Sequence, residues 1–340
     1  MRKQHIYLDS AKLAEVQAVG VFNGVKMMDA QPGFSPANIN MPAGILSQVS
    51  VNVVNNILQH RAGDEALGGR QRLLEFYQQE YYVPMVERLG TTVPYNDYDD
   101  AISAGINLSF DKTGHYRFSN NVVVGELEEA QLSAANVNAR DYITSASAEA
   151  LMIEFNRVAF NGYVDNAGKN LVYGLLNNPS LNAYETASKK FAEMSWQELV
   201  AFFGKAVSKI RTQSGNNVQR GSKLRCVVSA NAIDYLIYKW TEMGVNVLVE
   251  LNKAMEMLKL EFSLIPALEL DKANANQDVI YFILENNLGG VSNTTTLGYS
   301  EIARMGNVVV GSSYTMQKMS VGTTGAVVFK PAFVLRYTNI

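Results

Sequence analysis

The longest uninterrupted pattern in the chain covers residues 126–161, which contain neither glycine nor proline. Apolar side chains recur there at helical spacing, so that they share one face of a helix. They are Ala134, Val137, Tyr142, Ile143, Ala146, Ala150 and Ile153, continued by Leu151, Phe155, Val158 and Ala159. Glu126, Glu128 and Glu129 stand in the first turn, where the helix dipole favours negative charge. We therefore expect one continuous helix, about 54 Å long, that acts as a spine.

The first 87 residues, which precede the first expected strand, divide into two segments. Residues 1–64 are rich in proline and glycine between positions 32 and 44, and we interpret them as an arm, with an ordinary surface loop as the alternative. Over residues 64–87, leucines and tyrosines recur at helical spacing. This spacing predicts a second helix, which Pro84 ends or kinks.

A hairpin is expected between that helix and the spine. Residues 101–110 and 116–124 have the character of strands, and the sequence Asp-Lys-Thr-Gly at 111–114 is a good reversal signal between them. Few positions in these strands are strongly apolar. A two-stranded hairpin without a core of its own is marginally stable, so we expect it to lie on another surface.

The rest of the chain alternates helices and strands before ending in strands. Residues 195–198 match a capping box and begin an amphipathic helix that continues to about residue 210. Further helices are predicted at 231–240 and 246–259, and strands at 224–228, 279–284, 308–310, 314–320, 326–329 and 333–337. The Gly-Thr-Thr-Gly sequence at 322–325 is expected to be a turn, and the Asn- and Thr-rich tract at 286–296 a surface loop. The predicted class is α+β.

Composition adds a shortage of charge to this pattern. Charged residues are 18% of the 340 residues, where about 25% is usual. With 47% hydrophobic residues and a net charge of −3, intrinsic disorder and a generally basic nucleic-acid-coating protein are excluded, although a local basic patch is not. One chain of this size cannot bury much more than about three quarters of its unfolded surface. We therefore favour surfaces that are buried against other subunits over an unusually large core.

Neither a membrane segment nor a secretory signal is expected. No run approaches 18 apolar residues, and the basic start at residues 1–5 is not followed by an apolar region. The single cysteine, Cys226, cannot form an internal disulfide, which fits a reducing cytosol.

The residues that could carry chemistry do not form a catalytic pattern. His5, His60 and His115 are far apart in polar contexts and are expected at the surface, and Cys226 in its apolar run is expected to be a buried thiol. The segment 215–223 superficially resembles a phosphate-binding loop, but its spacing and its Ser-Lys order are wrong, so a flexible loop is expected. The acidic turn at 97–100 lacks the glycine and final glutamate of a calcium loop. We expect no catalytic, cofactor-binding or metal-binding residue.

Three segments give the chain a resemblance to a known family. They are YNDY at 95–98 with GINL at 105–108, the run from FNGY to YGLLNNPSL at 160–181, and MSVGTTGAVVFKP at 319–331. Over residues 65–340 the chain resembles the major capsid proteins of tailed bacteriophages with the Hong Kong 97-type fold. The segment at 160–181 is the most specific of the three.

The resemblance implies a role for each part of the chain. It divides the chain into an N-terminal arm (1–64), a helical lead-in (65–90), an extended loop (91–124), a peripheral domain with the spine helix (125–189), an axial domain (190–304) and returning strands of the peripheral domain (305–340). The arm and the extended loop would contact neighbouring subunits. Some relatives carry a Lys–Asn crosslink, for which Lys112 is the obvious donor, but no partner residues can be placed from the sequence.

The implied function is structural rather than enzymatic. Copies of the chain would form hexamers and pentamers that close into an icosahedral shell around double-stranded DNA, without sequence-specific DNA binding. The protein would be made in the bacterial cytoplasm and end in the virion. A portal and possibly a decoration protein are implied partners, and the short segment before the loop favours a separate scaffold. The alternatives are an encapsulin-like nanocompartment shell and an oligomeric α+β enzyme.

Overall fold

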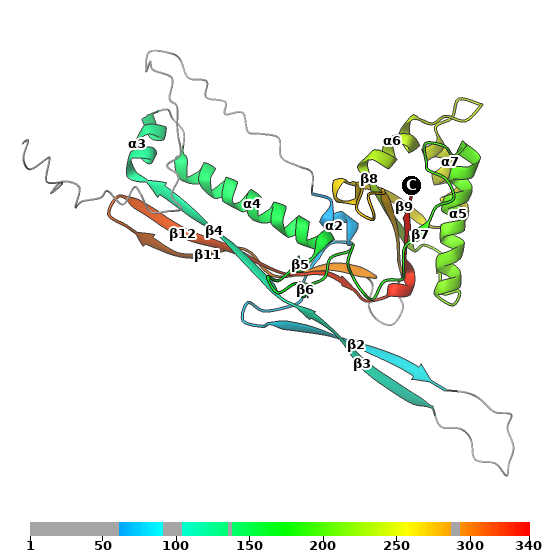
Figure 1. Ribbon diagram of the computed structural model, residues 1–340, viewed down its shortest axis with the longest axis horizontal. Helices are drawn as coiled ribbons and strands as arrows, with labels where there is room; N and C mark the ends of the chain where they lie inside the picture. Colours follow the sequence, from blue (N-terminus) through cyan, green and yellow to red (C-terminus); the bar gives the residue numbers. More distant parts are fainter. Residues whose placement is uncertain (1–60, 91–103, 135–137, 287–292) are drawn as a thin grey trace, which may run out of the picture.

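The fold consists of two lobes and a projecting hairpin, shown in Figure 1. The computed structural model describes residues 61–90, 104–134, 138–286 and 293–340. One lobe carries a long helix along a sheet, and the other carries shorter helices around a second sheet. The expected arm lies outside the described residues, apart from its last four positions.

The first lobe is built on a four-stranded sheet. In spatial order its strands are β1 (Arg70–Arg72), β11 (Thr295–Val310), β12 (Tyr314–Val328) and β4 (Tyr116–Gly125). The last three pair antiparallel, whereas β1 adds in parallel to one end of β11. Helix α4 (Ala139–Asn161) lies along this sheet and buries Leu151, Phe155 and Ala159 in the core of the lobe. The strands predicted at 308–310 and 314–320 are confirmed.

Two predictions for this sheet are wrong. The expected turn at 322–325 lies inside β12, where Gly325 adopts a positive φ of 68° and the strand continues on either side. In the Asn- and Thr-rich tract, residues 287–292 lie outside the described residues, but Thr294, Thr295 and Thr296 are fully buried rather than exposed. Their hydroxyl groups are satisfied by the carbonyls of Leu284, Leu67 and Gly69, which explains why a polar run can enter the interior.

The spine is divided into two helices, so the prediction of one continuous helix is wrong. Helix α3 covers Glu126–Ala134, and α4 begins at Ala139. Asn138 precedes α4 in an extended conformation, and its side-chain oxygen accepts a hydrogen bond from the backbone nitrogen of Asp141. An Asn in this position satisfies one of the free N–H groups of a new helix and so favours a start there. With 23 residues, α4 is about 35 Å long.

The segment before the spine is also different from the prediction. Only α2 (Gly63–Ala66) is helical there, and residues 80–89 form strand β2 (Glu80–Leu89). The partner of β2 is β3 (Gly105–Gly114), so the hairpin joins β2 to β3 rather than β3 to β4. The expected turn at 111–114 is the end of β3, paired with Glu80–Val83, whereas β4 pairs with β12. The helical prediction for 64–87 and the hairpin prediction for 101–124 are both corrected by this pairing.

The second lobe contains a five-stranded mixed sheet. Its order is β7 (Glu185–Thr186), β13 (Val334–Thr338), β10 (Val279–Glu285), β8 (Lys223–Ser229) and β9 (Glu261–Ala267). It packs with helices α5 (Trp196–Gln213), α6 (Ala230–Tyr238) and α7 (Val247–Met257) around a core of Phe191, Phe203 and Phe282. The predicted capping box is present: the N–H of Glu198 donates to the Ser195 hydroxyl, and the N–H of Ser195 donates to the Glu198 carboxylate. The predicted helices and the strands at 224–228 and 279–284 are confirmed.

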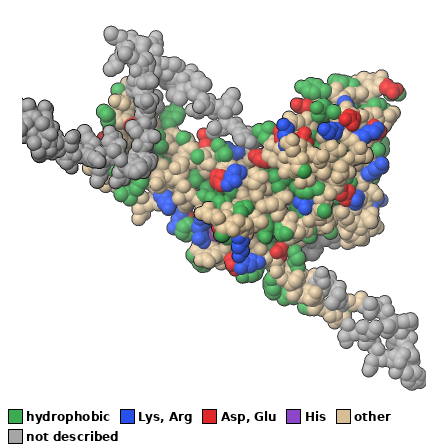
Figure 2. All heavy atoms as spheres, in the orientation of Figure 1, with side chains coloured by type: hydrophobic (Ala, Val, Ile, Leu, Met, Phe, Trp, Pro, Cys, Tyr) green, Lys and Arg blue, Asp and Glu red, His purple; other side chains and the backbone are tan. Residues whose placement is uncertain are grey.

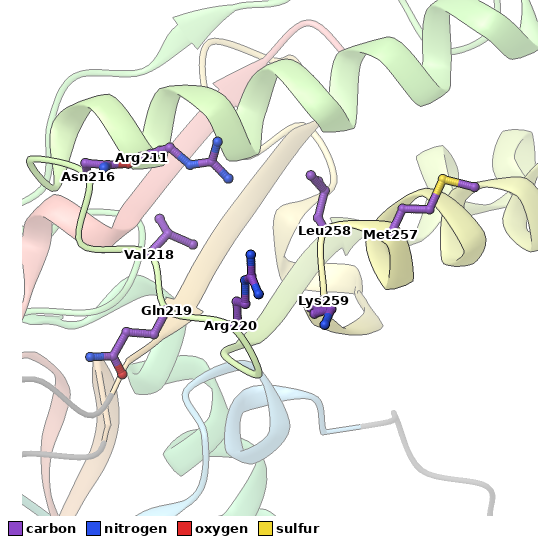
Figure 3. Close-up of a pocket in the computed structure, with 8 residues that line it drawn as sticks. All are labelled: Arg211, Asn216, Val218, Gln219, Arg220, Met257, Leu258 and Lys259. Atoms are coloured by element: carbon purple, nitrogen blue, oxygen red, sulfur yellow. The ribbon is translucent and has the colours of Figure 1, made fainter.

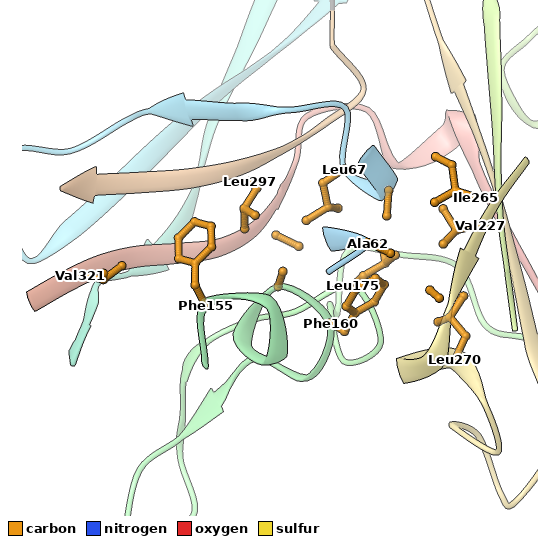
Figure 4. Close-up of a cluster of buried hydrophobic side chains, with 14 of the residues drawn as sticks. Ala62, Leu67, Phe155, Phe160, Leu175, Val227, Ile265, Leu270, Leu297 and Val321 are labelled. Atoms are coloured by element: carbon orange, nitrogen blue, oxygen red, sulfur yellow. The ribbon is translucent and has the colours of Figure 1, made fainter. Parts of the chain in front are cut away.

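One core cluster joins the two lobes, as Figure 4 shows. It brings Phe155 and Phe160 of α4 together with Val227 of β8 and Ile265 of β9, and Leu67 from the end of α2 packs in the same cluster. A small two-stranded sheet, β5 (Tyr163–Val164) with β6 (Asn170–Val172), follows α4. Because α2 leads directly into this shared core, the described start of the chain is fixed at the junction of the lobes.

Candidate functional site

The β2–β3 hairpin presents one apolar face that nothing in the described chain covers. In the antiparallel register, Val86 lies opposite Leu108 and Pro84 opposite Phe110. Opposite residues of an antiparallel pair point to the same face. We call Tyr82, Pro84, Val86, Ile106, Leu108 and Phe110 the hairpin face. Ile106 is 73% exposed and Phe110 61% exposed, and Figure 2 shows hydrophobic side chains where the hairpin leaves the body.

The root of the hairpin is held by polar contacts. The Lys112 ammonium lies 2.5 Å from a carboxylate oxygen of Glu80, and the hydroxyl of Tyr82 donates to the same carboxylate. The hydrogen bond from Lys112 holds the pKa of Glu80 below its usual value, with a further contribution from Tyr82. Lys112, which the sequence offered as a crosslink donor, is therefore ion-paired within its own hairpin.

His115 lies at the same root, between β3 and β4, and is only 7% exposed. The prediction of a surface histidine is therefore wrong for this residue. Its Nδ1 lies 2.7 Å from the carbonyl oxygen of Gln78, which can only accept, so Nδ1 donates. In the neutral ring, Nε2 then accepts from the Ser300 hydroxyl at 2.8 Å. His5 and His60 lie outside the described residues.

Burial makes the hairpin root sensitive to pH. It lowers the pKa of His115 below 6.5, and the nearby charge of Arg117 adds to this, against the raising effects of the Gln78 carbonyl and Glu301. A lowered pKa in the folded state means that stability present above about pH 6.5 is lost as the pH falls through the folded pKa. We expect thermal unfolding temperatures measured between about pH 7.5 and about pH 5 to fall more steeply for the wild type than for His115→Gln. Parallel profiles of the two proteins would contradict this assignment.

Two further surfaces expose large apolar side chains. At the tip of the second lobe, the end of α6 and its connection to α7 expose Tyr238, Trp240 and Met243, of which Met243 is 93% exposed. Lys239 anchors this connection by donating to the carbonyls of Phe191, Ala192 and Met194. At the far end of the first lobe, the end of β11 exposes Met305, Val308, Val309 and Val310. Together with the hairpin face, these surfaces lie at three separate extremities of the molecule.

The residues considered for chemistry do not converge. Cys226 is completely buried in the second lobe, and burial raises the pKa of its thiol well above the usual value. Glu126, Glu128 and Glu129 lie in the first turn of α3, as the dipole argument requires. The acidic turn at 97–100 is outside the described residues. Within the described ranges, no three His, Cys, Asp or Glu side chains are grouped so that they could hold a metal ion. None of the described helices is long and apolar enough to cross a membrane.

Strand β2, which forms half of the hairpin face, is the element that the sequence did not predict. The signal was the short continuous run of apolar and aromatic residues at 81–86, which is typical of a strand. β2 ends at Leu89 and its partner β3 begins at Gly105, so no short turn between the two strands marks the hairpin in the sequence.

Comparisons with solved structures show the fold. The capsid of Myoviridae phage XM1 aligns with a TM-score of 0.69 and 13% identity over 88% of this chain and 99% of that one. The capsid of the native GTA particle aligns with a TM-score of 0.58 and 9% identity over 90% and 99%, and the Mycobacterium phage Bobi structure with 0.56 and 9% over 87% and 96%. A search of curated protein sequences finds no significant match.

A family model identifies the chain more directly than these structures do. The model described as Pa193 gp26 major capsid protein matches residues 32–339, which is nearly the whole sequence. This match and the structural similarities confirm the α+β fold of the Hong Kong 97 type, and they favour a phage shell protein over the encapsulin and enzyme alternatives. The chain belongs to the Pa193 gp26 major capsid protein family and is a structural protein of a tailed-phage shell.

Proposed function

We propose that this capsid protein builds the hexamers and pentamers of its shell by laying the hairpin face across a neighbouring copy of the chain. The uncovered hairpin face is the observation that carries the proposal. A two-stranded ribbon is marginal in water without a surface to pack on. Burial of one large aliphatic or aromatic side chain contributes about 1.5–3 kcal/mol, and the face holds several. Membership of a capsid family, whose proteins assemble with copies of themselves, makes a second copy the fitting partner.

The same reasoning revises the expected domain scheme. We assign the extended loop to the ribbon of β2 and β3, and residues 91–103, which join these strands in the sequence, lie outside the described residues. We assign the first lobe, with α3, α4 and the sheet of β1, β11, β12 and β4, to the peripheral domain, and the second lobe, with α5 to α7 and the sheet of β7, β13, β10, β8 and β9, to the axial domain. The expected boundaries move accordingly, because β7 and β13 belong to the second lobe and β11 to the first. The exposed end of α6 and its connection to α7, with Tyr238, Trp240 and Met243, would then meet their copies at the centre of each capsomer.

The remaining partners are proposed from the capsid family alone. The shell would enclose double-stranded DNA in the virion after synthesis in the bacterial cytoplasm. A separate scaffold, a portal and a decoration protein would act during or after assembly. The arm at 1–64 would contact neighbouring subunits.

A charge placed on the hairpin face tests the proposal. Leu108→Asp introduces a carboxylate into the surface that would be buried, which costs several kcal/mol in each contact. We expect this variant to remain as unassembled subunits or capsomers in sedimentation velocity and electron microscopy, under conditions in which the wild type forms shells.

The matched control is the next residue on the same strand. Ser109 is exposed on the opposite face of the ribbon, so Ser109→Asp adds the same charge without entering the proposed contact. It should assemble like the wild type. Circular dichroism spectra should be the same for both variants, because both positions are exposed in the subunit. Normal shells from Leu108→Asp would show that the hairpin face is not an assembly contact.

A further inference from the structure

A pocket opens in the second lobe where the C-terminal ends of α5 and α7 meet the loop that follows α5. Its volume is about 320 Å³, within the range of small-ligand sites. The C-terminal end of α5, the loop that follows it and the C-terminal end of α7 form its wall, as Figure 3 shows. The lining residues are Arg211, Asn216, Val218, Gln219, Arg220, Met257, Leu258 and Lys259.

The pocket is strongly basic in a chain that is acidic overall. Arg211, Arg220 and Lys259 contribute three positive charges, and no carboxylate lines the pocket, whereas the whole chain has a net charge of −3. Among the ion pairs of the described residues, none involves these three side chains. Figure 3 shows the guanidinium groups of Arg211 and Arg220 extending from α5 and from the loop, with Lys259 beside Arg220. The site therefore offers three cationic groups that pair with no carboxylate of the described residues.

The backbone around the pocket is already fixed. The N–H of Gly221 donates to the carbonyl of Lys259 at 2.7 Å, and the N–H of Asn216 donates to the carbonyl of Arg211 at the same distance. These bonds tie the loop to the ends of both helices. Gly221 has a φ of 83°, which a glycine adopts without strain. The loop expected to be flexible from its sequence is thus a structured rim, and a preformed rim lowers the entropy cost of binding.

We propose that this pocket binds phosphate groups. Two arginine guanidinium groups can each present a fork of donors to phosphate oxygens, and three charges match a run of phosphates better than a single carboxylate. Val218 and Leu258 add apolar surface to the pocket wall beside these cationic groups. The chemistry differs from that of a nucleotide-binding phosphate loop, because Lys223 lies outside the pocket and pairs with Glu261.

The phosphates can come from two sources, the backbone of nucleic acid or a free polyphosphate, and both share this chemistry. The proposal stands independently of the hairpin contact, since the pocket lies in the other lobe. Sodium tripolyphosphate and a short double-stranded DNA are the two probes, added to purified full-length protein. Isothermal titration measures the first and fluorescence anisotropy the second.

The variants separate a built site from general surface charge. Arg220→Gln removes a charge from the pocket, and Arg220→Lys keeps the charge but loses the fork. Lys205→Gln removes a charge from an exposed position on α5 that does not line the pocket. We expect Arg220→Gln to weaken tripolyphosphate binding by about tenfold or more and Arg220→Lys by less, while Lys205→Gln stays within about twofold. Because these side chains take part in no ion pair of the described part of the chain, the substitutions should leave the fold intact.

Each outcome decides the proposal. If DNA binding falls in parallel with tripolyphosphate binding, the site takes the nucleic-acid backbone. If only tripolyphosphate binds, it takes free polyanions, and both results support a phosphate site. The proposal fails if neither probe binds saturably or if Lys205→Gln weakens binding as much as Arg220→Gln. It also fails if an oligoglutamate peptide binds more tightly than tripolyphosphate, because the pocket would then be a site for an acidic protein segment.

Discussion

Replacement of Arg225 by alanine is expected to lower the free energy of unfolding by about 3–5 kcal/mol, because it leaves a nearly buried charge without its partner. The Arg225 guanidinium lies 2.8 Å from the Glu285 carboxylate and is almost fully buried. It also donates to the carbonyls of Glu65 and Ala66 at the end of α2, and to the Thr295 hydroxyl of β11. The Arg225 side chain, which belongs to the sheet of the second lobe, therefore donates to oxygen atoms of both lobes.

The loss should be largest at the junction of the lobes. Without the guanidinium, Glu285 keeps its charge in a poorly solvated place, and the two carbonyls lose a donor. The end of α2 would no longer be fixed to β8, so the first described helix should loosen before the second core unfolds. Urea unfolding of disassembled subunits measures the change, and hydrogen exchange at 63–67 locates it.

Lys223→Ala supplies the matched control for this prediction. Lys223 stands two residues earlier on the same strand and pairs with Glu261 at 3.8 Å, with both side chains about two-thirds exposed. Exposed pairs of this kind contribute about 0–1 kcal/mol. The two alanine variants should therefore differ by several kcal/mol. Equal and small losses would show that the Arg225 contacts do not hold the lobes together.

The elements that were predicted correctly are those whose signals are local. The helix that begins at Trp196 carries its start signal in the adjacent Ser195 and Glu198. Strands β8 and β10 are short apolar runs that are buried on both sides, a pattern that needs no knowledge of partners. The capsid resemblance, resting on 160–181 and 319–331, gave the fold and function that the family match confirms.

The errors arise where distant residues decide the structure. Glu80–Leu89 forms a strand because it pairs with Gly105–Gly114. The turn signal at 111–114 instead suggested that Gly105–Gly114 pairs with the segment that follows it. His115 is buried because Ser300, far away in the sequence, and Gln78 supply its hydrogen bonds. Neighbouring residues in the sequence do not contain this information, so a polar context was a poor guide to exposure.

The segment at 160–181, on which the family resemblance most depends, contains a close crossing of the backbone. The chain leaves α4, forms the small β5–β6 sheet and returns, and the N–H of Leu175 donates to the carbonyl of Ala159 at 2.9 Å. The N–H of Leu176 donates to the carbonyl of Phe160 at 2.9 Å. At this crossing, Gly174 lies directly against the backbone of Phe160 and Gly162. A side chain at position 174 would occupy space that main-chain atoms already fill.

Gly174→Ala is therefore expected to destabilise the subunit by about 3 kcal/mol or more, at or above the upper end of overpacking effects. The new Cβ would meet the Phe160 carbonyl and the Gly162 nitrogen well inside van der Waals contact, and neither can move without breaking the end of α4. Gly204→Ala is the same substitution in the interior of α5, where an added Cβ meets nothing within 4 Å, and it should stabilise by about 0.5–1 kcal/mol. Thermal unfolding of the two variants should thus shift in opposite directions. A Gly174→Ala protein that melts within a degree or two of the wild type would show that the crossing can relax, and that the glycine is not required for packing.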